Sequence, residues 1–291
     1  MSTQIPSQTT LTLSAPGKLN LFLHINSQRK DGYHNLQTLF QIIDLADVLH
    51  FKPQSTLSLS ILDTKKNNLS NKNNLIIQAA NALNKYAKTN YGACISLEKN
   101  LPIGGGVGGG SSDAATTLLG LNRLWALGLS VDELAKIGHT LGADVPVFVR
   151  GHSALAEGIG EKLTPVELEQ KYYLIVKPDE HVSTQKIFTS KQLTRDTPYF
   201  SIRPPFEMDC LQDFHNDCEP LVKNLYPNVA QVFRMLAKFG STRLTGTGAC
   251  VFVIFNEATQ AQEALNQLPK SVNAWVAKGL NVSLTHIELS K

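Results

Sequence analysis

The chain has 291 residues, of which 42% are hydrophobic and 18% charged, a composition typical of folded globular proteins rather than disordered ones. It contains no apolar run near the roughly 18 residues that a membrane-spanning helix needs, and its first residues lack the pattern of a signal peptide. The formal net charge is only +3, so we expect neither a nucleic acid nor a membrane as partner. The four cysteines include no CxxC pair, which favours reduced thiols and a cytoplasmic protein.

The first hundred residues alternate between short apolar runs and turn-forming residues. This pattern predicts strands over residues 11–13, 19–25 and 57–62. The Asn- and Lys-rich stretch 65–74 predicts a surface loop. Apolar residues at helical spacing then predict a helix over 75–86, and a further strand is expected over 93–97.

A helix is predicted directly after a glycine cluster, from the apolar face formed by Ala114, Leu118, Leu121 and Trp125. We expect Ser111 or Ser112 as its N-cap and Gly128 as its end. The stretch 130–133 (SVDE) has the pattern of a capping box, which predicts a second helix that ends near Gly142.

The rest of the chain mixes strand and helix patterns. Strands are predicted over 145–149, 153–156, 172–177, 249–255 and 282–288, helices over 229–239 and 259–268, and a proline-containing loop over 191–205. Because the elements alternate without a βαβ rhythm, the expected fold class is α+β. We expect two lobes, residues 1–170 and residues 171–291.

The strongest local signal is a cluster of six glycines in seven positions, from Gly104 to Gly110. Ordering so many glycines costs much conformational entropy, so an ordinary loop explains the cluster poorly. Glycine lets the backbone curl around a ligand and point several N–H groups into one concavity. The helix that follows adds its free N–H groups and the positive end of its dipole. We therefore predict a phosphate-binding loop.

This loop does not fit the common nucleotide-binding motifs. The chain contains no GxxxxGK[ST] sequence. Gly104, Gly106 and Gly109 satisfy GxGxxG, but the acidic residue about twenty positions later, Asp132, lies in the capping box rather than at a strand end. A nicotinamide or flavin ligand is therefore disfavoured, and the HRD and DFG motifs of protein kinases are missing as well.

Residues 102–115 (PIGGGVGGGSSDAA) resemble the second motif of the GHMP small-molecule kinases, which include galactokinase and the homoserine, mevalonate and phosphomevalonate kinases. Residues 15–21 (APGKLNL) resemble the first motif of this family, and residues 244–250 (LTGTGAC) resemble the third. The resemblance implies a two-lobed α+β fold with the active site between the lobes. It also implies ATP with Mg²⁺ as the cofactor, with the glycine loop wrapped around the phosphates.

Carried over onto matching positions, the resemblance implies two sets of site residues. The catalytic residues are Lys18 and Asp144. The carboxylate would orient a hydroxyl and accept its proton, and the lysine would keep the carboxylate ionised and offset developing charge. By sequence alone, Asp144 could equally be a turn residue and Lys18 an exposed strand-edge charge. The ATP-binding residues are Asn74, Lys99, Pro102, Ile103, Gly104, Gly105, Gly106, Val107, Gly108, Gly109, Gly110, Ser111 and Ser112.

Further stretches resemble one branch of the family, whose members phosphorylate a small substrate that carries a cytidine diphosphate group. They are residues 29–34 (RKDGYH), 36–41 (LQTLFQ) and 142–148 (GADVPVF). This branch implies that Tyr33 and Phe188 stack on the two faces of the cytosine and that His34 bonds its polar edge. Asn20, Gly246 and Thr247 would contact the remainder of the substrate. The residues themselves also allow a turn tyrosine and a core phenylalanine.

Two other functions stay open. The chain could be a mevalonate- or homoserine-type kinase, although the aromatic turn at Tyr33 would then have no base to stack on. It could also be a family member that binds ligands without turning them over, although both Lys18 and Asp144 are retained. We expect no metal held by protein ligands alone, because the candidates lack a complete ligand set or have structural explanations: Asp113, Thr116, Thr117, Cys210, His215 and Cys218.

Overall fold

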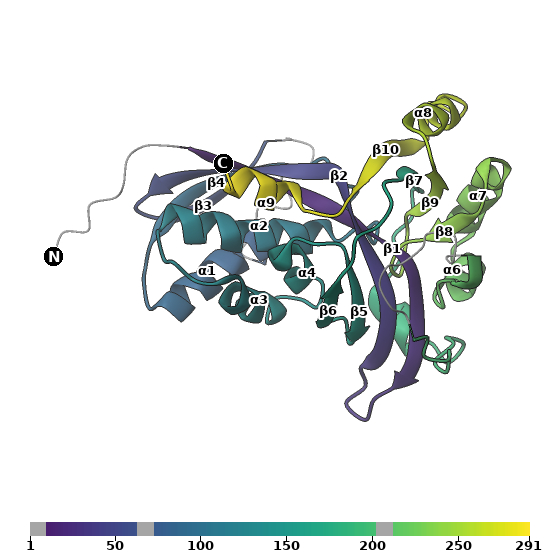
Figure 1. The fold of residues 1–291 in the computed structure, drawn as a ribbon, viewed down its shortest axis with the longest axis horizontal. Helices are drawn as coiled ribbons and strands as arrows, with labels where there is room; N and C mark the ends of the chain where they lie inside the picture. Colours follow the sequence, from purple (N-terminus) through teal and green to yellow (C-terminus); the bar gives the residue numbers. More distant parts are fainter. Residues whose placement is uncertain (1–9, 63–72, 202–211) are drawn as a thin grey trace.

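The structure, a computed structural model, describes residues 10–62, 73–201 and 212–291 and has the expected α+β fold (Figure 1). Within these ranges ten strands form one sheet, in which β3 and β4 are parallel and the other pairs are antiparallel. The strands are β1 (Leu11–Gln28), β2 (His34–Gln54), β3 (Leu57–Ile61), β4 (Gly92–Glu98), β5 (Ala154–Gly158), β6 (Lys162–Pro165), β7 (Tyr172–Lys177), β8 (Thr242–Leu244), β9 (Val251–Phe255) and β10 (Asn273–Leu280).

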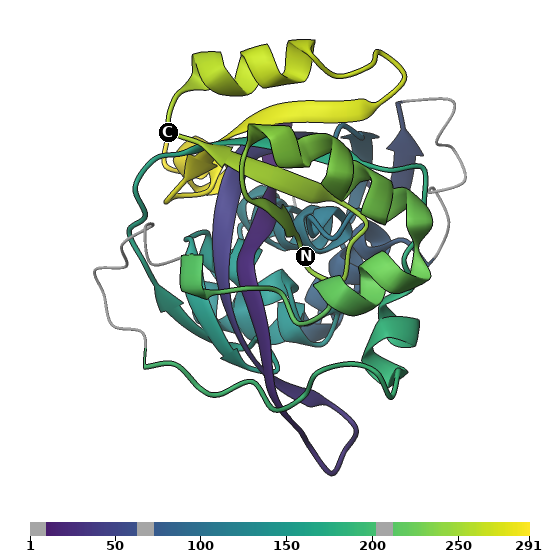
Figure 2. The same ribbon diagram turned by 90° about the vertical axis from the view of Figure 1, so that its right-hand side faces the viewer.

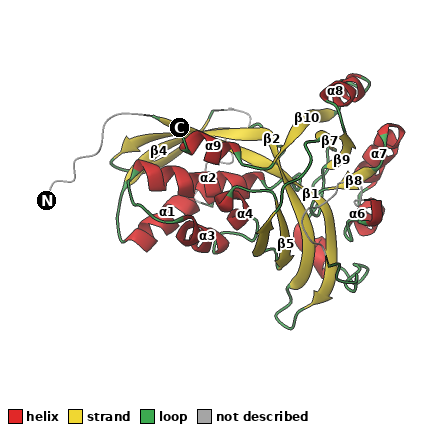
Figure 3. Ribbon diagram, in the orientation of Figure 1, coloured by secondary structure: helices red, strands yellow, loops and turns green. Residues whose placement is uncertain are grey.

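The helices of the described ranges lie in both halves of the chain (Figure 3). They are α1 (Leu75–Ala87), α2 (Gly109–Leu124), α3 (Val131–His139), α4 (Val145–Arg150), α5 (Thr184–Thr189), α6 (Glu219–Leu225), α7 (Pro227–Leu236), α8 (Ala258–Asn266) and α9 (Leu284–Leu289), with a 3₁₀ turn over Ala237–Phe239. Among the described residues, no helix is both long and apolar enough to cross a membrane.

The long antiparallel pair of β1 and β2 runs through the whole molecule, and its turn projects at one end (Figure 1). The separate strands expected over 11–13 and 19–25 are one strand, because Pro16 and Gly17 lie at a shift of register rather than at a break. Strand β2 was not predicted. It carries buried and exposed polar residues among its apolar ones, so its alternation is irregular.

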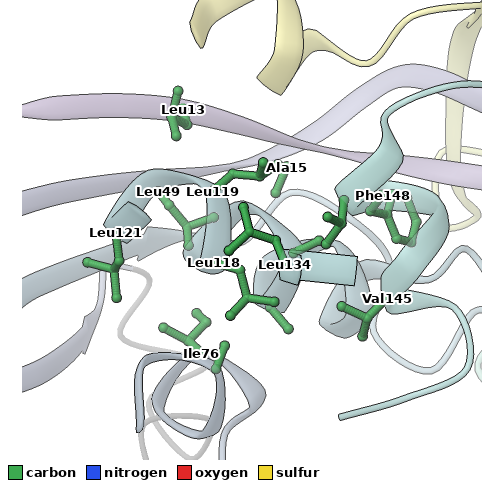
Figure 4. Packing of buried hydrophobic residues seen from close by; sticks show 14 of the residues in the cluster. Leu13, Ala15, Leu49, Ile76, Leu118, Leu119, Leu121, Leu134, Val145 and Phe148 are labelled. Carbon is green, nitrogen blue, oxygen red and sulfur yellow. The ribbon is translucent and has the colours of Figure 1, made fainter. Parts of the chain in front are cut away.

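The core of the first lobe lies between the sheet and helices α1 to α4. Helix α2 packs against β1, β2, α1 and α4, and its Leu118 and Leu121 are completely buried. Figure 4 shows these leucines with Leu13 and Leu49 of the sheet. Burial of such side chains stabilises the fold by roughly 1.5–3 kcal/mol each. The helix that follows the glycine loop is therefore firmly anchored.

The second lobe consists of β7, β9 and β8 with helices α6, α7 and α8 (Figure 2). Strand β10 joins the lobes, because it pairs with β7 along its length and with β2 through Leu280 and Ile42. The chain then returns to the first lobe, where Glu288 of α9 accepts hydrogen bonds from the backbone and hydroxyl of Ser14, both at 2.7 Å. The division at residue 170 stays a prediction.

Two predicted strands are helices, and both predicted ends of α2 are wrong, since its C-cap is Trp125 and not Gly128. Residues 145–149 form α4, because a fully buried apolar run does not distinguish strand from helix and Pro146 suits the first turn of a helix. Residues 282–288 contribute mainly to α9, which starts after Ser283. Helix α2 is capped by Gly108, not by Ser111 or Ser112, since the glycine loop itself turns into the helix.

Other elements are confirmed. Helix α1 and strands β4 and β7 lie where the sequence predicts them. The capping box is also present: the Ser130 hydroxyl accepts a hydrogen bond from the Glu133 backbone, and the Glu133 carboxylate accepts one from the Ser130 backbone. The loop expected over 65–74 lies largely outside the described residues, as does the end of the loop over 191–205.

Candidate active site

The glycine loop connects β4 to α2 and curls back on itself. Gly104, Gly106 and Gly108 have φ angles of 66°, 77° and 74°, a left-handed conformation that other residues adopt only with strain. The loop is tied to β1 by a hydrogen bond of 2.9 Å from the Lys18 backbone N–H to the Val107 carbonyl. Because α2 starts at Gly109, its first N–H groups and its positive dipole end are presented at the loop.

A cavity of about 520 Å³ lies against this loop. Asn74, Lys99 and every residue from Pro102 to Ser111 line it, and the family resemblance implies these residues for ATP. Ser112 does not line the cavity and is completely buried. Asn74 also caps α1 by accepting a hydrogen bond of 2.9 Å from the Ile76 backbone, which fixes its position at the cavity.

Behind the glycine loop, Lys99 lies between two carboxylates. Its Nζ is 2.8 Å from Asp113 Oδ2 and also contacts Asp47. Asp47 is completely buried and accepts hydrogen bonds from the backbone N–H groups of Asn100 and Leu101, at 2.6 and 2.7 Å. Burial raises the pKa of Asp113 to about 7, against the opposing effect of Lys99. The sequence analysis missed Asp47, which lies in the unpredicted strand β2.

Lys18 and Asp144 form an ion pair, with Lys18 Nζ 3.3 Å from Asp144 Oδ2. Lys18 is buried at a register shift in β1, and its ammonium also donates to Asn20 Oδ1 at 2.6 Å and to the Gly106 carbonyl at 3.0 Å. Asp144 comes just before α4, where the connection from α3 presents its carboxylate to the cavity. Its side chain is about one-third exposed (35%), so a substrate can reach it.

A second cavity of about 610 Å³ contains this ion pair. Its lining includes every substrate residue that the sequence predicted: Asn20, Tyr33, His34, Phe188, Gly246 and Thr247. Gly106, Gly108 and Ser111 line both cavities. The two cavities therefore adjoin at the glycine loop, and Lys18 lines the second cavity there, with its ammonium 3.0 Å from the Gly106 carbonyl.

Tyr33, His34 and Phe188 are aromatic residues in the lining of the second cavity, and they form its aromatic end. Tyr33 follows the turn between β1 and β2 and is 61% exposed, while His34 begins β2 and is buried. The rings of His34 and Phe188 are 5.2 Å apart between centroids. The guanidinium of Arg195 donates from Nε to His34 Nε2 at 3.0 Å. Burial lowers the pKa of His34 below its usual 6.5, and the charge of Arg195 lowers it further.

The glycine-containing loop of the second lobe closes the site. The Thr245 hydroxyl lies within hydrogen-bond distance of the Gly106 carbonyl (3.2 Å) and accepts from the Asn20 backbone (3.0 Å). The hydroxyls of Thr247 and Thr184 are 2.9 Å apart, which connects this loop to α5. Thr245 and Thr184 were not singled out from the sequence, although Thr245 stands inside the third motif-like stretch.

The remaining candidates have structural surroundings. The Thr117 hydroxyl donates to the Asp113 carbonyl within α2, and the Thr116 hydroxyl lies 3.5 Å from that of Thr285. His215 pairs with Asp217 at 2.8 Å, and Cys210 lies outside the described residues. Among the residues that the structure describes, no group of three His, Cys, Asp or Glu side chains could hold a metal ion.

Comparison with known proteins gives concordant results. Residues 74–152 match the family model for the GHMP kinases N terminal domain, and residues 208–274 match that for the GHMP kinases C terminal. The chain is 51% identical over 279 residues to 4-diphosphocytidyl-2-C-methyl-D-erythritol kinase of Shewanella loihica, covering 95% of this chain and 96% of that protein. It is 51% identical over 280 residues to the enzyme of the same name from Alcanivorax borkumensis, covering 95% and 93%.

Solved structures agree with these relatives. A crystal structure of 4-(cytidine 5'-diphospho)-2C-methyl-D-erythritol kinase superposes with a TM-score of 0.79 at 30% identity and covers 92% of this chain and 99% of its own. The mevalonate kinase of Methanococcus jannaschii superposes with a TM-score of 0.69, covering 96% and 100%, but its 17% identity shows a shared fold alone.

Proposed function

The chain belongs to the GHMP kinase family, and from that premise we propose that it is an ATP-dependent kinase that phosphorylates the 2-hydroxyl of 4-diphosphocytidyl-2-C-methyl-D-erythritol. This reaction belongs to the non-mevalonate route to isoprenoid precursors. The observation that carries the proposal is the ion pair of Lys18 and Asp144 beside the glycine loop, where the two cavities adjoin.

Asp144 acts on the substrate hydroxyl. Its carboxylate orients the hydroxyl and accepts its proton, while the hydroxyl oxygen forms a bond to the γ-phosphorus of ATP and the bond to the bridging oxygen of ADP breaks. Lys18 pairs with the Asp144 carboxylate at 3.3 Å and places a positive charge beside the glycine loop. Its buried position between Asn20, Gly106 and Asp144 holds the ammonium in place during the reaction.

The glycine-loop cavity would bind ATP. Its backbone N–H groups and the start of α2 suit the phosphates, and the cavity end at Asn74 and Lys99 suits the rest of the nucleotide. Magnesium fits this donor set, because it is usually held by nucleotide phosphates, water and one or two carboxylates, and Asp144 and Asp113 line the two cavities. The ion would neutralise phosphate charge.

The second cavity would bind the substrate, with its cytosine among Tyr33, His34 and Phe188 and its diphosphate near Gly246 and Thr247. Base stacking on aromatic rings is worth about 1–3 kcal/mol. Mevalonate and homoserine carry no base, so this aromatic end favours the cytidine substrate over mevalonate and homoserine. We also propose a cytoplasmic location, since Cys94, Cys218 and Cys250 are unpaired thiols among the described residues.

A transfer assay with the purified chain tests the function directly. ATP would be offered with 4-diphosphocytidyl-2-C-methyl-D-erythritol, mevalonate or homoserine in separate reactions, and ³¹P NMR would locate the new phosphate. We expect turnover of the cytidine substrate alone, with the phosphate on the 2-hydroxyl. Preferred turnover of mevalonate or homoserine, or no turnover of any of the three, would overturn the proposal.

A further inference from the structure

The guanidinium of Arg195 makes four hydrogen bonds at the aromatic end of the second cavity. Its Nε donates to His34 Nε2 at 3.0 Å. Its Nη2 donates to the carbonyls of Phe188 and Ser190, at 3.0 and 2.7 Å, and its Nη1 donates to the Leu193 carbonyl at 3.1 Å. Arg195 itself is not among the residues that line the cavity. It therefore acts through the side chains that it holds.

These contacts join two separate parts of the chain. His34 is the first residue of β2, whereas Phe188 belongs to α5 and Ser190 is the cap at the C-terminal end of that helix. A cation is well placed there, because the last carbonyls of a helix lack partners within the helix. The same side chain thus fixes the helix that carries Phe188 and the imidazole that lies 5.2 Å from its ring.

The direction of the bond to His34 determines the state of the imidazole. An arginine guanidinium stays protonated in proteins and has only donors. Its Nε–H can therefore bond to His34 Nε2 only if that nitrogen accepts, which places the single proton of the neutral ring on Nδ1. Burial and the charge of Arg195 both disfavour a second proton, in keeping with the lowered pKa of His34. Among the described residues, no hydrogen bond involves Nδ1.

We propose that Arg195 is a positioning residue that holds His34 as a hydrogen-bond donor at Nδ1 and thereby makes the cavity select cytosine over uracil. This inference rests on the proposed function, which places a cytidine group in this cavity. The ring nitrogen N3 of cytosine is an acceptor, whereas N3 of uracil carries a hydrogen. A fixed Nδ1–H donor matches the first base and opposes the second. A free imidazole could move its proton to Nε2 and accept from uracil, so it would discriminate less.

The test uses the conservative variant Arg195→Lys, which retains a positive charge and donors for the carbonyls at the end of α5 but lacks the planar fork. Arg150→Lys is the matched control, because Arg150 pairs with Asp132 on the surface and lines neither cavity. Two measurements are made on the full chain. One is the ¹⁵N NMR signature of the His34 ring without ligand. The other is the calorimetric affinity for CDP and for UDP.

We expect the Nδ1–H tautomer in the wild type and in Arg150→Lys, and a mixture of tautomers in Arg195→Lys. The ratio of CDP to UDP affinity should fall about tenfold in Arg195→Lys, which is the order of one net hydrogen bond. An Nε2–H tautomer in the wild type would overturn the inference. An unchanged ratio in Arg195→Lys, or an equal loss of affinity for CDP and UDP, would also overturn it, since Arg195 would then only fasten α5.

Both measurements are independent of phosphoryl transfer. If the wild type fails to phosphorylate 4-diphosphocytidyl-2-C-methyl-D-erythritol but shows the tautomer and prefers CDP, the proposed function falls and the role of Arg195 stands. If the wild type phosphorylates that substrate and Arg195→Lys retains the full CDP preference, the proposed function stands and the role of Arg195 falls. As a further readout, kcat for the cytidine substrate in Arg195→Lys should stay within about threefold of wild type while KM rises, because remote contacts alter binding in ground and transition states alike.

Discussion

The two cavities of this site differ in what they are made from. The wall of the first is mainly backbone, contributed by one continuous stretch from Pro102 to Ser111. The second is made mainly from side chains that come from six separate parts of the chain, between Lys18 and Thr247. A phosphate can be bound by N–H groups that any sequence possesses, provided that glycine permits the turn. A base and a reacting hydroxyl need particular side chains, which only the completed fold brings together.

This contrast predicts where single substitutions act. The largest effect is expected at Asp144, where the second cavity meets the glycine loop. Asp144→Asn removes the proton acceptor but keeps the size of the side chain, so kcat should fall by about 100-fold or more, the usual contribution of a general base. ATP affinity should change little, because the glycine loop is intact. Steady-state kinetics and calorimetry would measure the two quantities.

A control for the loss of a carboxylate is Asp132→Asn. Asp132 is exposed, pairs with Arg150 and lines neither cavity, so the kcat of Asp132→Asn should stay at the wild-type value. A kcat for Asp144→Asn within a few-fold of wild type would contradict the assignment of the proton acceptor.

The next effect belongs to the backbone-built cavity. A Cβ added at Gly106 would lie 2.3 Å from the Thr245 carbonyl oxygen and 3.0 Å from that of Gly248, at a φ angle of 77°. Gly106→Ala should therefore distort the loop and weaken ATP binding by about tenfold or more. Gly110→Ala is the comparison, because its Cβ would meet only Leu75 at 3.5 Å. Calorimetry should show that Gly110→Ala binds ATP more tightly than Gly106→Ala does. Equal ATP affinities of the two variants would contradict the explanation by close approach of the backbone.

A smaller effect is expected from the aromatic side chains of the second cavity. Tyr33→Ala or Phe188→Ala should weaken binding of the cytidine substrate by about 1–3 kcal/mol, seen chiefly in KM. The KM for ATP should stay close to wild type, since neither residue lines the glycine-loop cavity. The double variant should lose less than the sum of the two, because a base freed on one face can tilt.

Tyr199→Ala is the matched control for Tyr33→Ala, since Tyr199 is exposed to the same extent (60%) and lines neither cavity. If Tyr33→Ala and Phe188→Ala both leave substrate KM unchanged, the base lies elsewhere.

The same contrast explains what the sequence could predict. The glycine loop and the capping box of α3 depend on neighbours within a few residues, so their patterns are visible in one stretch of chain. Strand β2 was missed because its burial comes from partners on both sides, β1 and β4, and not from its own alternation. Helix α4 was mistaken for a strand because all of its apolar residues are buried.

Within the site, the residues that lie in motif-like stretches were predicted, whereas the residues that hold them in position were not. Lys18 and Asp144 lie 126 positions apart in the sequence, and only a family resemblance could associate them before the fold was known. Asp47 forms an ion pair with Lys99 and accepts hydrogen bonds from two backbone N–H groups, but the sequence around it shows no motif. Arg195 likewise stands in a stretch of irregular loop, and its bond to His34 spans 161 positions. Such supports depend on tertiary contacts, which no short stretch of sequence specifies.

The smallest effect is expected from His24, whose titration acts on the stability of the fold and not on the two cavities. His24 is buried beside Phe22 and Phe214, lines neither cavity, and accepts a hydrogen bond of 3.3 Å from the His215 backbone. Its pKa is lowered from 6.5 to about 4, mainly by burial and also by the nearby His215, while Asp217 opposes the shift. Between these values the unfolded chain binds a proton that the folded chain does not, so the free energy of unfolding falls as the pH drops.

The slope from this one histidine is at most about 1.4 kcal/mol per pH unit between pH 6.5 and pH 4. His24→Gln keeps an acceptor for the His215 backbone but does not titrate, so urea unfolding should show a shallower pH dependence in this variant. Part of the slope should remain, because burial also lowers the pKa of His286. At pH 7.5 the kcat of His24→Gln and its KM values for ATP and for the cytidine substrate should equal those of the wild type. If the slope were the same in both proteins, the pKa of His24 in the folded chain would lie near its ordinary value, which would contradict the effect of burial.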